Sequence, residues 1–243
     1  MEINTNINLI STLLLLAGIA GIFLSILLLR KKNNYANRFL AVFIFSVAIT
    51  VIHHYLIDTN TIYYVPILIA IILPLEFIFP PALYLYVRIM TDKTNTIKKY
   101  QLHFLPALIG IILLIPFYQL DFITKLTIIQ NHFNQSLLPG LFHSTFPIFV
   151  TTTTIQALVY TVLIFKLLFF HHHKVAHYYS YRKNNTLSWL RNFMVVLVVF
   201  WLIASIVNYF YKQNTVPFNI DQLLYIFSAI AIIYIAIMGL RQP

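Results

Sequence analysis

The 243-residue chain contains no cysteine, so disulfide bonds, thiolate nucleophiles and cysteine-based metal sites are excluded. Charge is also scarce, because only 9% of the residues are Asp, Glu, Lys or Arg, against about 25% in a soluble domain. Glycine-rich phosphate loops, a G-x-S-x-G elbow, an H-E-x-x-H pattern and a paired-carboxylate motif are missing too. We therefore expect a protein that is not an enzyme, with no catalytic residue, cofactor or bound metal.

Apolar sequence is abundant, since hydrophobic residues make up 60% of the chain. A soluble core of this size cannot hide so much apolar surface, so lipid is the expected solvent. Each apolar run is long enough to cross the bilayer as a helix. The runs cover about residues 9–29, 39–58, 63–90, 102–118, 146–170, 189–211 and 220–240. The sequence thus predicts an all-α membrane protein, a seven-transmembrane helix bundle that forms one domain over residues 1–243.

The basic residues alternate between the connections, which predicts the orientation of the bundle. Fourteen of the sixteen fall on one side and only Lys125 and Lys212 on the other. The fourteen are Arg30, Lys31, Lys32, Arg38, Arg88, Lys93, Lys98, Lys99, Lys166, Lys174, Arg182, Lys183, Arg191 and Arg241. Because basic loops stay in the cytoplasm, we expect an external N-terminus and a cytoplasmic C-terminus in a bacterial cytoplasmic membrane. The net charge of +10 then reflects topology and contact with anionic headgroups.

Glu76 stands near the middle of the third run, where a carboxylate is costly and usually faces the bundle interior. One interpretation is a ligand contact or a proton-sensitive switch. The other is a buried acid that donates a hydrogen bond to a carbonyl freed by a nearby proline. The same run contains Pro66, Pro74, Pro80 and Pro81, so we expect it to be tilted or kinked.

Two adjacent histidines, His53 and His54, lie near the outer end of the second run. On a helix they point about 100° apart, so only one can face the bundle squarely. They are candidates for an outward-facing ligand or metal pocket, together with His132 or His143. The alternative is a pair of interfacial histidines that hydrogen-bond to headgroups and water.

Further polar residues are expected in the outer half of the bundle. Thr152 and Gln156 share a helix face at i, i+4 spacing, Asn208 ends the sixth run, and Asp221 opens the seventh. These residues are candidate ligand contacts in a cavity open to the outside, although threonines in membrane helices more often serve packing and interhelical hydrogen bonds. The histidines of residues 171–173 and His177 allow a metal pair geometrically, but interfacial charge is the favoured interpretation.

The connection after the fourth run is apolar between residues 122 and 129, which predicts a short helix at the membrane interface. The sequence shows no convincing internal repeat. Only the third run is interrupted by prolines, whereas transporters usually have broken helices in both halves. The seventh run has no lysine, which argues against a retinal Schiff base.

Five short stretches, in this order, resemble the N-terminal membrane domain of bacterial regulators that end in an AraC-type helix-turn-helix domain. They are NNYANRFL at 33–40, FPPALYLYV at 79–87, HFLP at 103–106, LSWLR at 187–191 and GLRQP at 239–243. The resemblance covers essentially the whole chain and implies a DNA-binding domain after residue 243. Where the family has a small or apolar residue before its proline–tyrosine segment, this chain has Glu76, so the resemblance assigns that residue no role.

The leading hypothesis is therefore a membrane sensor domain that passes a small-molecule or envelope signal to a cytoplasmic DNA-binding domain. Its partners are the lipid bilayer, the signal molecule, DNA through the following domain, and a second copy, since paired DNA half-sites favour a homodimer. A second hypothesis is the input domain of a sensor histidine kinase. A third is a small stand-alone transporter or membrane enzyme that uses Glu76 and the histidines.

Overall fold

The computed structural model describes residues 5, 7–31, 35–91, 97–130, 141–178, 187–212 and 221–242. These residues form helices and connections, with no strand among them. The long helices are α1 (Leu9–Arg30), α2 (Tyr35–Asp58), α8 (Leu141–Tyr178), α9 (Ser188–Lys212) and α10 (Asp221–Arg241). Their positions agree with five of the predicted runs, and α2 begins four residues earlier than expected. An all-α fold is thus confirmed for the described residues.

Within the described ranges, five helical segments are long and apolar enough to cross a membrane, so the chain is a multi-pass membrane protein. They are Leu9–Arg30, Tyr35–Asp58, Pro66–Thr91, Thr151–His171 and Leu223–Arg241. Tyr100–Leu113 and Ser188–Ile203 are apolar but shorter over their described residues.

The proline-rich third run is broken into short pieces, as its prolines predict. The chain forms 3-10 turns η1 (Thr61–Tyr64) and η2 (Pro66–Ile71), then α3 (Ile72–Glu76) and, after a turn at Phe77 and Ile78, α4 (Phe79–Thr91). The fourth run, which was expected to be uninterrupted by prolines, is also divided, into η3 (Ile97–Phe104), α5 (Leu105–Leu113) and α6 (Ile115–Tyr118), so that expectation was wrong. Pro106 and Pro116 lie in the first turns of α5 and α6, where a missing N–H costs least.

α1 packs through a seam of small residues. The helix begins after Asn8, whose side chain accepts a hydrogen bond from Ser11 N in a capping box. Most of the buried residues recur at spacings of three and four; they are Ser11, Leu14, Ala17, Gly18, Gly21, Ser25 and Leu28. A β-carbon at Gly18 would collide with Ile52 of α2, and one at Gly21 with Ile232 of α10. Small residues therefore let three helix backbones approach closely, the usual means of packing where lipid removes the hydrophobic driving force.

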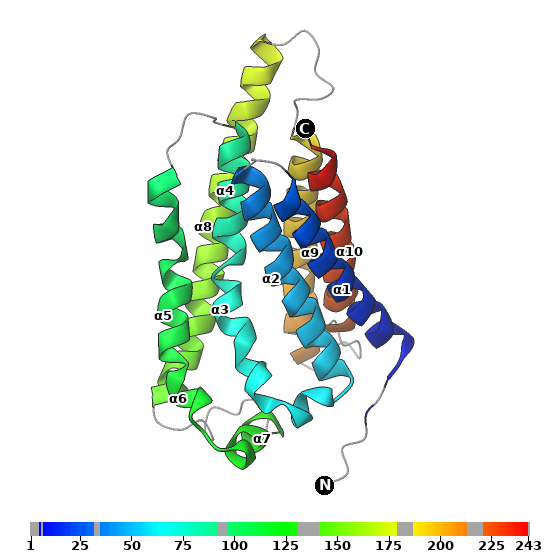
Figure 1. Ribbon diagram of the computed structural model, residues 1–243, viewed down its shortest axis with the longest axis vertical. Coiled ribbons are helices and arrows are strands. Elements are labelled where there is room, and N and C mark those ends of the chain that lie inside the picture. Colours follow the sequence, from blue (N-terminus) through cyan, green and yellow to red (C-terminus); the bar gives the residue numbers. More distant parts are fainter. Residues whose placement is uncertain are drawn as a thin grey trace.

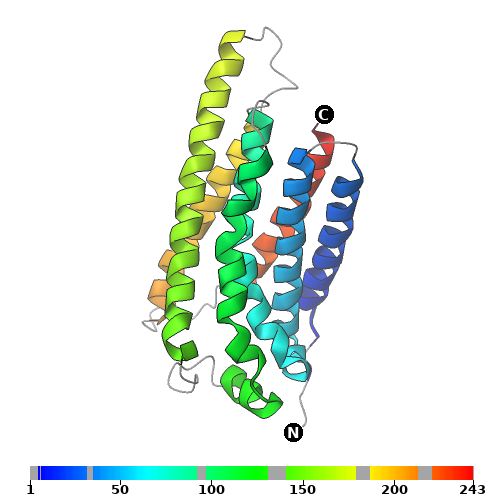
Figure 2. The same cartoon turned by 60° about the vertical axis from the view of Figure 1, so that its left-hand side comes forward.

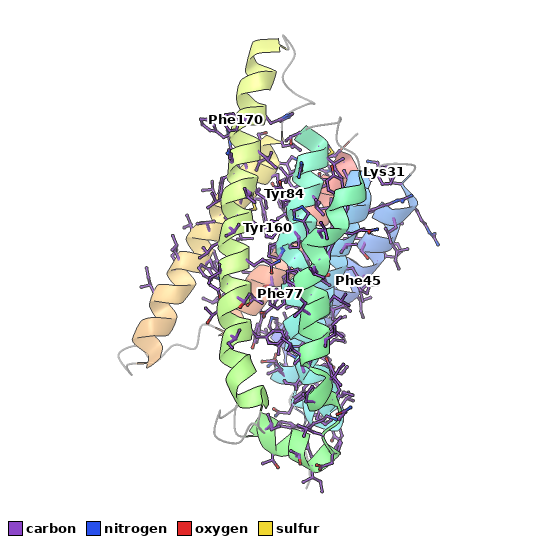
Figure 3. The ribbon with its side chains drawn as sticks, turned by 90° about the vertical axis from the view of Figure 1, so that its left-hand side faces the viewer. Lys31, Phe45, Phe77, Tyr84, Tyr160 and Phe170 are labelled. Atoms are coloured by element: carbon purple, nitrogen blue, oxygen red, sulfur yellow. The ribbon has the colours of Figure 1, made fainter. Side chains whose placement is uncertain are left out.

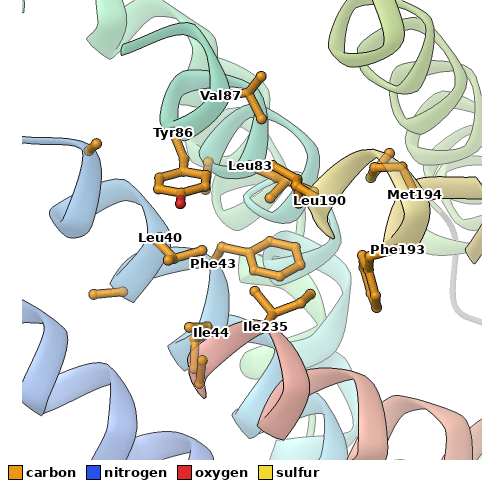
Figure 4. Close-up of a cluster of buried hydrophobic side chains, with 14 of the residues drawn as sticks. Leu40, Phe43, Ile44, Leu83, Tyr86, Val87, Leu190, Phe193, Met194 and Ile235 are labelled. Carbon is orange, nitrogen blue, oxygen red and sulfur yellow. The ribbon is translucent and has the colours of Figure 1, made fainter. Parts of the chain in front are cut away.

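The two ends of the bundle differ in construction. α1 begins at the lower end in Figure 1 and α10 finishes at the upper end, beside the end of α1 and the start of α2. We call the upper end the Arg241 end. Figure 2 shows α8 extending beyond its neighbours at the Arg241 end. The largest core cluster joins α2, α4, α9 and α10 and includes Leu40, Tyr86, Leu190 and Ile235 (Figure 4).

A short helix, α7 (Phe122–Gln130), lies across the other end of the bundle (Figure 1). The predicted helix at residues 122–129 is therefore confirmed. Ile128 is 1% exposed, whereas Ile123 is 73% exposed, so α7 packs one apolar side chain inward and leaves another on the surface. Lys125 Nζ donates to the carbonyls of Tyr118 and Leu120 at 2.9 and 2.6 Å and ties α7 to the end of α6.

Candidate functional site

The break between α3 and α4 is the centre of the candidate site. Pro81 has no N–H, so the carbonyl of Phe77 lacks its α-helical donor. The side chain of Gln156 on α8 supplies a replacement, because its Nε2 donates to Phe77 O at 3.3 Å. A hydrogen bond from Glu76 to a proline-freed carbonyl was one of its two sequence-based interpretations. For the carbonyl of Phe77, the donor in the structure is Gln156.

Glu76 is mostly buried and shares a side-chain hydrogen bond with Thr153 of α8. Thr153 is 8% exposed. Thr152, which the sequence placed in the site, is exposed on the outer surface of α8, and its hydroxyl donates to Ile148 O of its own helix at 2.6 Å. The sequence named Thr152 rather than its neighbour Thr153, and adjacent side chains point about 100° apart around a helix. Glu76 and Gln156 thus meet in one site and Thr152 does not join them.

The two histidines of α2 are both packed inside the protein, each against a different element. His53 is 5% exposed, neither of its ring nitrogens has a well-formed hydrogen bond, and its polar neighbour is the backbone of Ile69 in η2. The His54 ring stacks on Tyr225 of α10 with a centroid distance of 4.1 Å. The two rings diverge as predicted: His53 is the more deeply buried, and His54 is half-buried against α10.

The other predicted site residues cannot be located in the structure. The side chains of Asn208, Asp221 and His143, and all of His132, lie outside the described residues, as do the side chains of His172, His173 and His177. Among the residues that are described, no group of three or more His, Cys, Asp or Glu side chains is arranged to hold a metal ion.

A second polar cluster lies nearer the Arg241 end and was missed by the sequence reasoning. His103 of η3 and Tyr160 of α8 share a hydrogen bond of 2.7 Å between Nδ1 and Oη. Tyr84 of α4 packs against both rings, at 5.6 and 5.4 Å (Figure 3 shows Tyr84 beside Tyr160). Arg88 Nη1 donates to Tyr84 Oη at 3.4 Å.

The available signal for this second cluster was helical spacing. Tyr84 and Arg88 are four residues apart, and Tyr160 is four residues beyond Gln156, on the inward face of α8 that also contains Ile164 and Leu168. His103, however, comes from a separate element, and its pairing with Tyr160 has no counterpart in local sequence.

At the Arg241 end, Lys31 holds the last turn of α10. Its Nζ donates to Leu240 O at 3.0 Å and also to the carbonyl of Gln242. Beside it, a β-carbon at Gly239 would collide with Leu40 of α2. The end of α10 is therefore fixed to the first two helices by a charge on helix-terminal carbonyls and by close packing.

Comparison with family models, curated proteins and solved structures finds no match to this chain. Three arrangements stand out among the described residues: oxygen-rich groups at a helix break, a tyrosine–histidine cluster, and an α10 end held by Lys31.

Proposed function

We propose that the chain is the membrane-embedded input domain of a bacterial one-component regulator of the AraC type. In this proposal, seven helical segments cross the cytoplasmic membrane, the N-terminus is outside, and the C-terminus is in the cytoplasm. Two observations support this topology. α1 begins and α10 ends at opposite ends of the bundle (Figure 1), as an odd number of crossings requires. Arg30, Lys31 and Arg241 gather where α10 ends, in agreement with a positive inside.

The observation that carries the sensory role is the contact between Lys31 and the end of α10. α10 is the segment that leads out of the bundle, and its last carbonyls are bound by the connection between α1 and α2. A signal that favours one of two packings of the bundle would change this contact and so move residue 242. We assign the signal to a small molecule or an envelope component, and the response to a DNA-binding domain joined after residue 243.

The topology is testable because the chain has no cysteine, so single cysteines can be introduced without removing any. Thr5→Cys and Gln242→Cys are labelled with a membrane-impermeant maleimide, before and after the membrane is opened. We expect Thr5→Cys to react in intact cells and Gln242→Cys only after permeabilisation. Leu14→Cys, at a buried position, is the unreactive control. Labelling of Gln242→Cys in intact cells would contradict the proposal.

Signal transfer is tested by joining a DNA-binding reporter domain after residue 243 and measuring transcription in cells. A coupling of about 1 kcal/mol changes output about five-fold. We expect a change of that size for Lys31→Gln and near-normal output for Lys31→Arg, which keeps the charge at the α10 carbonyls. Equal output from wild type, Lys31→Gln and Lys31→Arg would remove the support for a signalling role. An intact gene without any DNA-binding region downstream would exclude the AraC-type output.

A stand-alone transporter is the second candidate, and the broken third helix favours it. Discontinuous helices near the membrane centre often form the substrate and ion sites of transporters, and Glu76 lies at such a break. Protein reconstituted in vesicles would then carry a solute flux that Glu76→Gln abolishes and Thr152→Val leaves intact. A flux insensitive to Glu76→Gln counts against this candidate.

A further inference from the structure

The break between α3 and α4 leaves more hydrogen-bond acceptors than donors. Pro80 and Pro81 have no N–H, so the carbonyls of Glu76 and Phe77 both lose their α-helical donors. In the hydrocarbon region of a membrane, water does not replace such donors. Every backbone oxygen at this break must therefore find a partner from within the protein or from a bound species.

The side chains around the break add further oxygens. Gln156 uses its Nε2 on Phe77 O at 3.3 Å, and its own Oε1 is buried without a hydrogen-bond partner. The carboxyl group of Glu76 is held against the Thr153 hydroxyl. Among the described residues, the side-chain donors seen at the break are the Gln156 amide and the Thr153 hydroxyl. They face two proline-freed carbonyls, a carboxylate and an orphaned amide oxygen.

This surplus of oxygen has the chemistry of a cation site. Hard cations take carboxylate, amide and main-chain oxygens, whereas zinc and copper favour imidazole and thiolate ligands. One carboxylate neutralises one positive charge, and an uncharged site is the stable arrangement in a low-dielectric interior. Unwound carbonyls at broken membrane helices bind Na⁺ on the same physical grounds.

We infer that the α3–α4 break binds one small monovalent cation of the Na⁺ class. The ligands are the Glu76 carboxylate, Gln156 Oε1, the Thr153 hydroxyl oxygen and the main-chain carbonyl of Glu76. The cation joins α3 to α8 across the break, so the occupied site stabilises one packing of these helices. This inference goes beyond the proposed functions, since a cation at this position is compatible with a sensor and with a transporter.

The test is thermal unfolding of the purified full chain at constant ionic strength and pH, in sodium, potassium or choline chloride. A ligand that binds only the folded state raises the unfolding temperature in a saturable manner. We expect sodium to raise it by several degrees relative to choline. Glu76→Gln and Gln156→Leu abolish the sodium effect. Thr152→Val, which alters an exposed neighbour outside the site, retains it.

A second variant tests the inference independently, in case Glu76→Gln fails to fold. Gln156→Glu places a second carboxylate at the break, which favours a divalent over a monovalent cation. We expect calcium to stabilise this variant more than sodium does, and calcium to have little effect on the wild type. Equal unfolding temperatures of the wild type in all three salts would overturn the inference, as would loss of the sodium effect in Thr152→Val. Because no output domain or flux is measured, either result leaves the proposed functions to their own tests.

Discussion

Lys31 Nζ lies 3.0 Å from the main-chain oxygen of Leu240, a residue 209 positions later in the chain. A lysine at the end of the first helix thus completes the hydrogen bonding of the last. Helix C-termini leave four carbonyls without internal donors, and a cation there also interacts favourably with the helix dipole. The contact therefore connects the C-terminal end of α1 to the C-terminal end of α10.

Replacing Lys31 should loosen α10. Hydrogen bonds from charged groups contribute about 1.5–3 kcal/mol, and partial exposure of Lys31 reduces this value. We expect Lys31→Gln to lower the free energy of unfolding by about 1 kcal/mol, and Lys31→Arg to lower it by less. Denaturant unfolding in micelles measures both. If Lys31→Gln and Lys31→Arg unfold identically, the ammonium does not hold the helix end.

The small-residue seam of α1 predicts a steric effect. A β-carbon at Gly21 meets Ile232 of α10 and Ala48 of α2, so Gly21→Val must push these helices apart. Overpacking of this kind costs about 1–3 kcal/mol. Ile19→Val, at an exposed position of the same helix, should be nearly neutral. Comparison of the unfolding free energies of Gly21→Val and Ile19→Val tests this close packing. Equal values would contradict it.

The hydrogen bond from Gln156 to the freed carbonyl of Phe77 predicts a selective loss. Gln156→Leu keeps the volume but removes the donor, and side-chain hydrogen bonds in membrane bundles average about 0.6 kcal/mol with a maximum near 1.7. We expect a destabilisation in that range. Thr152→Val loses only a bond within its own exposed helix turn and should cost less. The reverse order would show that the α3–α4 break does not depend on Gln156.

The hydrogen bond between His103 and Tyr160 predicts a difference between two tyrosines. Tyr160→Phe removes a 2.7 Å hydrogen bond, whereas Tyr84→Phe removes a longer contact of 3.4 Å from Arg88. Tyr160→Phe should therefore be the more destabilising variant, by about 1 kcal/mol. Denaturant unfolding of the two variants, which lose the same atom from the same cluster, provides the measurement. A more severe effect from Tyr84→Phe would contradict the assigned geometry.

The start of α7 should respond to acid. Thr124 donates to the Asp121 carboxylate from its hydroxyl and its backbone N–H, at 2.5 and 3.0 Å, and these bonds lower the pKa of Asp121 from its ordinary 3.8. Because the folded-state pKa is depressed, the contribution is complete well above pH 3.8 and is lost as the pH falls through the folded value. Amide exchange in α7 should accelerate over that range, but not in Asp121→Asn, which has no acid to titrate.

Much of the fold was predictable because its signals are local. The apolar runs indicated where helices lie, and the distortion of the third run follows from the missing N–H groups of its prolines. The division of the fourth run at Pro106 and Pro116 was not predicted. For the candidate site, the sequence named Glu76, Thr152 and Gln156 by their polarity in apolar surroundings. The structure brings Thr153 rather than Thr152 to Glu76, and the four threonines 151–154 give no periodicity from which to choose a face.

The amino-acid sequence by itself determined the helical class, the membrane environment and the approximate ends of the helices, because these depend on run length, composition and backbone chemistry within a few residues. Only the tertiary structure decided which side of each helix faces inward and which distant groups meet. The pairings of Lys31 with α10, His103 with Tyr160, and Gln156 with Phe77 depend on the rotation and depth of each helix. Those are set by close packing between segments far apart in the chain, and one residue along a helix turns the side chain by about 100°.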